Sequence, residues 1–135
     1  MGNEKKQGKG SVERSIKTHK DLEVWKKAMS LVENVYRVTT DYPTSEMYGL
    51  TLQTRKSAVS VPSNIAEGAA RFSNEEFIHF LYVALGSIAE LETQLMVACR
   101  LESLKNKEVF ENVIETRRVL LGLIRYVKEK KLNSC

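Results

Sequence analysis

The stretch that decides the fold is residues 73–98, SNEEFIHFLYVALGSIAELETQLMVA. It opens with Ser73 and Glu76 in the S-x-x-E spacing of a capping box, which satisfies free backbone N–H groups at a helix start. Apolar residues then recur at alternating spacings of four and three, which is typical of the seam of a helical bundle. The seam consists of Phe77, Leu81, Ala84, Ile88, Leu91, Leu95 and Ala98, and a set beside it of Phe80, Leu85 and Met96.

Two further amphipathic helices are expected at the two ends of the chain. We expect the first to begin with Asp21 as its N-cap and to end near Asp41, before Tyr42-Pro43. Its predicted buried face consists of Leu22, Trp25, Met29, Val32 and Tyr36. We expect the last to run from about Asn106 to Lys131. Its inward residues are predicted to be Phe110, Val113, Leu120, Ile124 and Val127.

The remaining helix, expected to start at Thr44 or Ser45, carries two apolar stripes. One stripe consists of Met47, Leu50, Ala58, Val61 and Ile65, and the other of Leu52, Val59 and Ala66. A helix that is apolar on more than one side is buried on more than one side, which indicates a partner subunit in so short a chain. With no strand pattern, the chain is predicted to be all-α: an antiparallel up-down-up-down four-helix bundle over 20–131, between a disordered basic tail (1–19) and a C-terminal tail (132–135).

The segment that joins the second and third helices concentrates unusual residues. Pro62 lacks an N–H and is expected to kink the second helix, and Gly68 is expected to end it in a left-handed conformation. Asn64 can then satisfy loose backbone groups, while Glu67 can pair with Arg71. The structural interpretation is favoured, and the alternative is that this corner is a docking surface.

Charge is distributed unevenly along the 135 residues, whose net charge is +4. Residues 1–20 hold six basic and two acidic groups, whereas residues 21–135 hold 15 of each. Residues 117–131 are again basic, with six cations against one Glu. Clusters at both ends are a weak nucleic-acid signal, and the alternative is a solvated tail plus cations that suit a helix C-terminus. The candidate contacts are Lys5, Lys6, Lys9, Arg117, Arg118, Arg125, Lys128, Lys130 and Lys131.

Residues that carry catalytic or metal chemistry are scarce in this chain. The two histidines, His19 and His79, lack the neighbours of a metal-binding motif, and no phosphate-binding glycine loop occurs. Cys99 falls in an apolar helical pattern without a nearby histidine, so packing is favoured over nucleophilic catalysis. Glu90 lies beside the seam and is expected to form a structural ion pair with Arg55, Lys56 or Arg71. The sequence therefore predicts no catalytic residue, no metal and no cofactor.

The expected cellular compartment follows from the lack of membrane-spanning and targeting segments in the sequence. No stretch approaches the roughly 20 uninterrupted apolar residues that span a bilayer. The start, MGNEKKQGKG, has no apolar core, and the lysine at position 6 does not fit the myristoylation pattern. We expect a cytoplasmic protein with reduced thiols and no membrane partner.

The run from Ala58 to Gly68, AVSVPSNIAEG, followed by Arg71 and Ser73, resembles the four-helix-bundle proteins encoded in 23S rRNA intervening sequences. The similarity continues through the third helix and covers roughly residues 19–130. It implies a homopentamer of antiparallel four-helix bundles, in a family without an established enzymatic activity. A distant branch, the accessory proteins of diversity-generating retroelements, binds a reverse transcriptase and nucleic acid through a basic surface, but lacks the S-x-P-S-N-I-A-E-G run.

These observations lead to one favoured hypothesis and two competitors. The favoured one is a non-enzymatic homo-oligomer that binds nucleic acid, with RNA preferred over DNA, through its basic terminal segments. The first competitor is a protein-interaction hub with no nucleic-acid role that grips a partner at the 60–72 corner, or a retroelement accessory protein that docks a reverse transcriptase. The second is a hydrolase or metal enzyme, for which the sequence offers no constellation of ligands or nucleophile.

Overall fold

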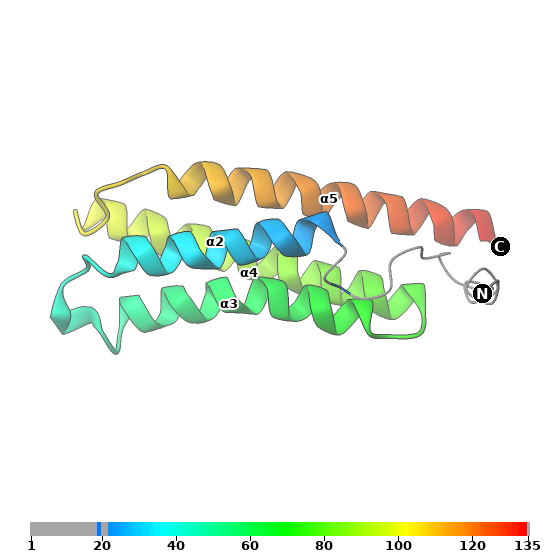
Figure 1. The fold of residues 1–135 in the computed structure, drawn as a ribbon, viewed down its shortest axis with the longest axis horizontal. Helices are drawn as coiled ribbons and strands as arrows, with labels where there is room; N and C mark the ends of the chain where they lie inside the picture. Colours follow the sequence, from blue (N-terminus) through cyan, green and yellow to red (C-terminus); the bar gives the residue numbers. More distant parts are fainter. Residues whose placement is uncertain (1–18, 20–21, 135) are drawn as a thin grey trace.

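The computed structural model describes residues 19 and 22–134, with the side chains of 131–134 left out. Four α-helices account for most of this part: α2 (Glu23–Thr39), α3 (Leu50–Ala69), α4 (Asn74–Arg100) and α5 (Val109–Ser134). A short 3-10 helix, η2 (Thr44–Glu46), lies between α2 and α3. The described residues contain no strand, so the fold is all-α (Figure 1).

The helices lie side by side and form a four-helix bundle (Figure 1). α3 packs against α2 and α4, and α5 packs against the other sides of α2 and α4. The turn from α3 to α4 (residues 70–73) lies at one end, and the connections around η2 and between α4 and α5 lie at the other. We call the end with residues 70–73 the α3–α4 end. The start of α2 and the end of α5 lie at this same end.

The core is built around α4, as the heptad pattern predicts. Every residue of the predicted seam, from Phe77 to Ala98, is buried. Ser73 caps the helix, because its Oγ accepts a hydrogen bond from the backbone N–H of Glu76 at 3.1 Å. The flanking set is only partly covered, since Phe80 and Leu85 are half-buried and Met96 is exposed. α4 is long and apolar enough to cross a membrane by composition, but a bundle's core helix passes the same test.

The buried face of α2 differs from the predicted one. The residues that enter the core are Val24, Ala28, Leu31, Val35 and Thr39. Of the predicted set only Leu22 is buried, while Met29 and Tyr36 are exposed. Both sets have helical spacing and lie on neighbouring faces, so spacing alone did not distinguish them. The N-cap position is held by Leu22, without a side-chain cap, and not by Asp21, which lies outside the described residues.

The start of α3 also differs from the prediction. Thr44 and Ser45 belong to η2, and α3 begins only at Leu50. Glu46 connects the two, because its carboxylate accepts a hydrogen bond from the Leu50 N–H at 3.0 Å. Of the first predicted stripe, Ala58, Val61 and Ile65 are buried and Leu50 is half-buried, but Met47 is exposed and lies outside α3. In the second stripe, Ala66 is half-buried, and Leu52 and Val59 are exposed within one chain.

α5 carries the predicted inward residues with one exception. Val113, Leu120, Ile124 and Val127 are buried, and Phe110 is only half-buried. The helix begins at Val109, three residues after Asn106, whose side-chain oxygen accepts a hydrogen bond from the Glu108 N–H at 2.9 Å. It continues to Ser134, beyond the end expected from the sequence.

Candidate nucleic-acid and partner surfaces

The predicted nucleic-acid contacts fall into three groups in the structure. Lys5, Lys6 and Lys9 lie outside the described residues, and of Lys131 only the backbone is described. Arg117 and Arg118 lie in the middle of α5. The remaining three, Arg125, Lys128 and Lys130, lie in its last turns, at the α3–α4 end.

The two mid-helix arginines are engaged in ion pairs. Arg117 is half-buried and pairs with Glu92 of α4. Arg118 Nη2 lies 2.7 Å from Glu115 Oε2, which Lys27 Nζ of α2 approaches at 3.6 Å. The hydrogen bond from Arg118 is the main cause that lowers the pKa of Glu115 below its ordinary value. These cations are therefore partly neutralised, which weakens their candidacy as phosphate contacts.

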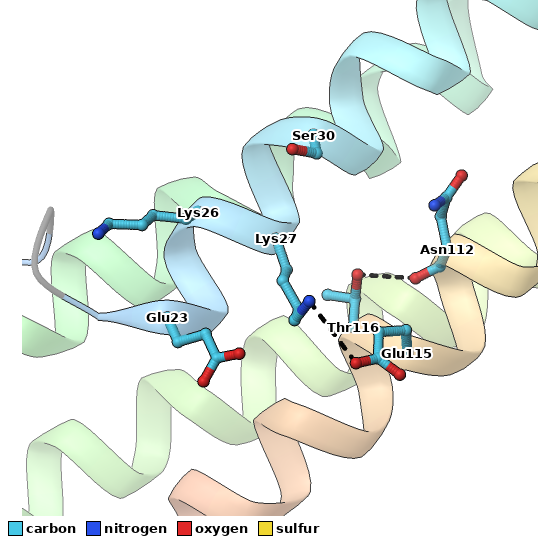
Figure 2. Close-up of a pocket in the computed structure, with 7 residues that line it drawn as sticks. All are labelled: Glu23, Lys26, Lys27, Ser30, Asn112, Glu115 and Thr116. Carbon is cyan, nitrogen blue, oxygen red and sulfur yellow. Dashed lines mark hydrogen bonds and ion pairs between the residues drawn. The ribbon is translucent and has the colours of Figure 1, made fainter.

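A polar groove of about 330 Å³ lies between α2 and α5, beside this ion-pair network (Figure 2). It is lined by Glu23, Lys26, Lys27, Ser30, Asn112, Glu115 and Thr116. Lys27 and Glu115 point toward each other across the groove, and Thr116 Oγ1 donates to the Asn112 carbonyl oxygen at 2.7 Å (Figure 2). The Glu115 carboxylate is thus engaged by two cations, Lys27 and Arg118, and the Thr116 hydroxyl by the backbone of its own helix.

The cations in the last turns of α5 have aromatic neighbours. Lys128 Nζ donates a hydrogen bond to Tyr82 Oη of α4 at 2.9 Å and lies 5.4 Å from the centre of that ring. Lys130 Nζ lies 5.5 Å from the centre of the Tyr126 ring. Among the described residues no carboxylate forms an ion pair with Arg125 or Lys128. The basic character of α5 is thus concentrated at the α3–α4 end.

The corner between α3 and α4 corrects the expectation for Gly68. α3 continues through Pro62 to Ala69, and Pro62 is buried within it. Gly68 lies inside the helix and does not end it in a left-handed conformation. A Cβ on Gly68 would lie 2.8 Å from Phe80 Cβ and 3.2 Å from the Phe77 carbonyl oxygen. The glycine is therefore required for the close approach of α3 and α4.

Asn64 takes part in a polar link between α3 and α4. Its Nδ2 donates to the Ser60 carbonyl oxygen at 2.8 Å and lies 3.0 Å from Ser60 Oγ. Ser60 Oγ in turn lies 2.6 Å from Ser87 Oγ of α4. Asn64 thus satisfies a backbone carbonyl, as predicted, and also supports a hydroxyl pair that the sequence did not indicate.

The predicted pair of Glu67 and Arg71 is present, with 2.5 Å between the carboxylate and the guanidinium. Arg71 also lies 3.9 Å from Glu76 and stacks over the Phe80 ring at 4.8 Å from its centre. Its side chain is therefore held against α4. Next to it, Phe72 is 97% exposed, the most exposed large apolar residue in the described part of the chain.

Glu90 does not form the expected buried ion pair. It is exposed on α4 and lines a shallow polar groove of about 300 Å³ between α3 and α4. Lys56 lines the same groove, but no ion pair joins the two, and Arg55 instead donates to Thr39 Oγ1 and stacks on Tyr36. The position beside the seam points outward, so the carboxylate stays in water.

An apolar groove of about 320 Å³ between α2 and α3 is a feature that the sequence did not locate. It is lined by Trp25, Met29, Val32, Val59, Pro62, Ser63 and Ala66. Met29 and Val59 are 39% and 40% exposed, respectively. The residues on the α2 side of this groove were predicted to be core, so the sequence offered no reason to expect a groove there. A second apolar face of α2 could have indicated it, because that face has helical spacing and competes for the core. It consists of Val24, Ala28, Leu31 and Val35.

Two features of the described residues bear on metal binding and on thiol chemistry. No cluster of three or more His, Cys, Asp or Glu side chains is close enough to hold a metal ion. Cys99 is a half-buried free thiol.

A family model described as 23S rRNA-intervening sequence protein matches residues 20–124. No curated protein matches the chain.

Proposed function

The chain belongs to the 23S rRNA-intervening sequence protein family, and from this premise we propose a non-enzymatic, homo-oligomeric protein that binds nucleic acid. Its bundle has antiparallel up-down-up-down topology, its preferred ligand is RNA over DNA, and it acts in the cytoplasm. The binding surface is the α3–α4 end of each bundle.

One observation carries this proposal: the last turns of α5, which hold exposed cations, and the start of α2 share one end of the bundle (Figure 1). Arg125, Lys128 and Lys130 lie there, and the lysine-rich segment that contains Lys5, Lys6 and Lys9 leads into α2 at the same end. We propose that both basic clusters act on one ligand. A positively charged end attracts the phosphate backbone irrespective of sequence and releases its counterions.

Self-association is supported by the apolar groove between α2 and α3. Met29 and Val59 are 39% and 40% exposed, and contiguous exposed apolar surface marks an interaction site. The ring size that we propose is five, which rests on the family resemblance. A ring presents several weak basic ends at once, so that binding to a long RNA gains from avidity.

The test is the affinity for a generic RNA, measured by fluorescence anisotropy across a salt series. We expect log Kd to rise linearly with log salt, with a slope set by the number of phosphates contacted. The molar mass in solution, measured with and without RNA, reports the assembly. No binding at low salt, or a slope near zero, contradicts the proposal.

A second candidate, docking of a protein such as a reverse transcriptase at the corner, is favoured by Phe72 alone. This ring is almost fully exposed on the α3–α4 turn, whereas Asn64 is hydrogen-bonded within α3 and Arg71 is held by Glu67 and Phe80. A pull-down compares the wild-type protein with Phe72→Ala. Loss of a protein partner while the oligomer survives favours this candidate.

A further inference from the structure

We propose that the α3–α4 end takes single-stranded nucleic acid, whose bases stack on Tyr82 and Tyr126. The inference rests on the proposed function, because it names the ligand class of the same surface. It depends on two exposed aromatic rings, each of which has a lysine ammonium beside it.

The two rings are available to a ligand. Tyr82 on α4 is 44% exposed, and Tyr126 on α5 is 46% exposed. One aromatic–cation contact joins two helices, because Lys128 of α5 lies over the Tyr82 ring of α4. The other lies within α5, where Lys130 follows Tyr126 by four residues. Exposed contacts of this kind are weak, so a ligand can displace the ammonium from the ring.

The helix geometry of α5 sets these groups on two flanks of one surface. Residues on a helix follow one another at about 100°, so Tyr126 and Lys128 point to nearly opposite sides. Lys128 lies on the flank that faces α4, because it contacts Tyr82. Exposed Arg125 lies on the outer side of the same turns. A strand that crosses the outside of α5 therefore meets a tyrosine with a lysine, then an arginine, then a second tyrosine with a lysine.

This alternation of rings and cations favours a single strand over a duplex. In a duplex the base faces are stacked on one another and cannot reach a tyrosine on a convex helix, so only the lysines and arginine would contribute. A single strand offers its phosphates to the cations and its base faces to the rings, irrespective of sequence.

The experiment compares a single-stranded RNA with a duplex RNA of equal length, at one fixed salt concentration, by fluorescence anisotropy. The variants are Tyr82→Ala and Tyr126→Ala, with Tyr82→Phe and Tyr126→Phe as versions that keep the ring. The matched control is Tyr48→Ala, since Tyr48 is 88% exposed and precedes α3 at the opposite end of the bundle. Single-stranded DNA of the same sequence serves as a further ligand that shares the stacking chemistry.

We expect wild-type protein to bind the single strand more tightly than the duplex. Each alanine variant should bind the single strand roughly tenfold more weakly and the duplex with unchanged affinity, while the phenylalanine variants and Tyr48→Ala behave as wild type. Equal affinity for both RNAs, with tyrosine variants that match Tyr48→Ala, overturns this inference and leaves the proposed function intact. Absence of binding to either RNA overturns both.

Discussion

Gly68 on α3 lies so close to Phe80 on α4 that a Cβ on the glycine would stand 2.8 Å from the Phe80 Cβ. The same atom would lie 3.1 Å from Phe77 Cδ1 and 3.2 Å from the Phe77 carbonyl oxygen. Two of these three neighbours are close to the backbone and cannot swing away. The missing side chain is therefore what lets the two helices approach at the corner.

Gly68→Ala should destabilise the protein, although a change from glycine to alanine within a helix usually stabilises it. Overpacking of a tight contact costs about 1–3 kcal/mol, which outweighs the roughly 0.5–1 kcal/mol that alanine gains over glycine in a helix. Urea unfolding at fixed protein concentration measures the difference.

Gly86→Ala and Gly122→Ala are matched controls, because an added Cβ at either helical glycine meets nothing within 4 Å. Both should stabilise the protein by about 0.5–1 kcal/mol. If Gly68→Ala were as stable as these controls, the close approach of α3 and α4 would not depend on the glycine.

Arg125→Gln should weaken RNA binding, whereas Arg117→Gln should act on stability alone. Arg125 is exposed and has no carboxylate partner in the described part of the chain, but Arg117 is paired with Glu92. Loss of one phosphate contact should lower the salt slope by about 1. Loss of the half-exposed pair should cost about 0.2–1 kcal/mol of unfolding free energy. Anisotropy measures the effect on RNA affinity, and urea unfolding measures the effect on stability. An equal loss of affinity in both variants would contradict the assignment of Arg125, and not Arg117, as a phosphate contact.

Sequence reasoning succeeded where one periodic face was clearly stronger than its neighbours. The seam of α4 is apolar at every heptad position and is buried as predicted. α2 carries two adjacent faces, and the one with the larger residues, Trp25 and Met29, was taken as core although Val24 and Ala28 are buried. The size of an apolar side chain does not tell which way its helix face points. Which face of α2 is buried depends on how the helix packs against α3 and α5.

The corner was misread for a related reason. A glycine near a helix end is often a C-cap, so the local rule predicted that the helix ends at Gly68 in a left-handed conformation. In the structure Gly68 packs against Phe80, which is twelve positions away in the chain. Rules that consider only neighbouring residues cannot predict this contact. The ion pair of Arg117 could not be inferred from the sequence either, because Glu92 is brought beside Arg117 only by the packing of α4 on α5. The pair of Glu115 and Arg118, in contrast, is three residues apart on one helix and could have been predicted from that spacing.

Val59→Glu should reduce the molar mass of the assembly. Val59 lines the apolar groove between α2 and α3, and a carboxylate there would lose its water if a second copy covered it. Light scattering measures the mass, and circular dichroism checks that the monomer keeps its helices. Val83→Glu is the control, because Val83 is similarly exposed on α4, away from this groove. Disassembly by Val83→Glu but not by Val59→Glu would place the subunit contact elsewhere.

Tyr42→Phe should abolish a loss of stability at alkaline pH. The Tyr42 hydroxyl is buried and has no hydrogen-bond partner among the described residues. Burial, with a smaller contribution from Cys99, raises the pKa of Tyr42 to about 12 from its ordinary value of 10.0. Between these values the unfolded chain has released the proton and the folded chain still holds it. Unfolding then releases a proton, so the free energy of unfolding falls as pH rises through this range.

The measurement is urea unfolding of wild-type and Tyr42→Phe protein at several pH values from 8 to 12. Below about pH 10 the variant should be equally or more stable, since it lacks an unpaired buried hydroxyl that costs about 1–3 kcal/mol. Above that pH the wild type should lose stability relative to the variant. Deprotonation of lysines affects both proteins alike, and Tyr48→Phe, a change at an exposed tyrosine, should follow the wild type throughout. Parallel curves for wild type and Tyr42→Phe up to pH 12 would mean that the hydroxyl ionises as freely in the folded protein as in the unfolded chain.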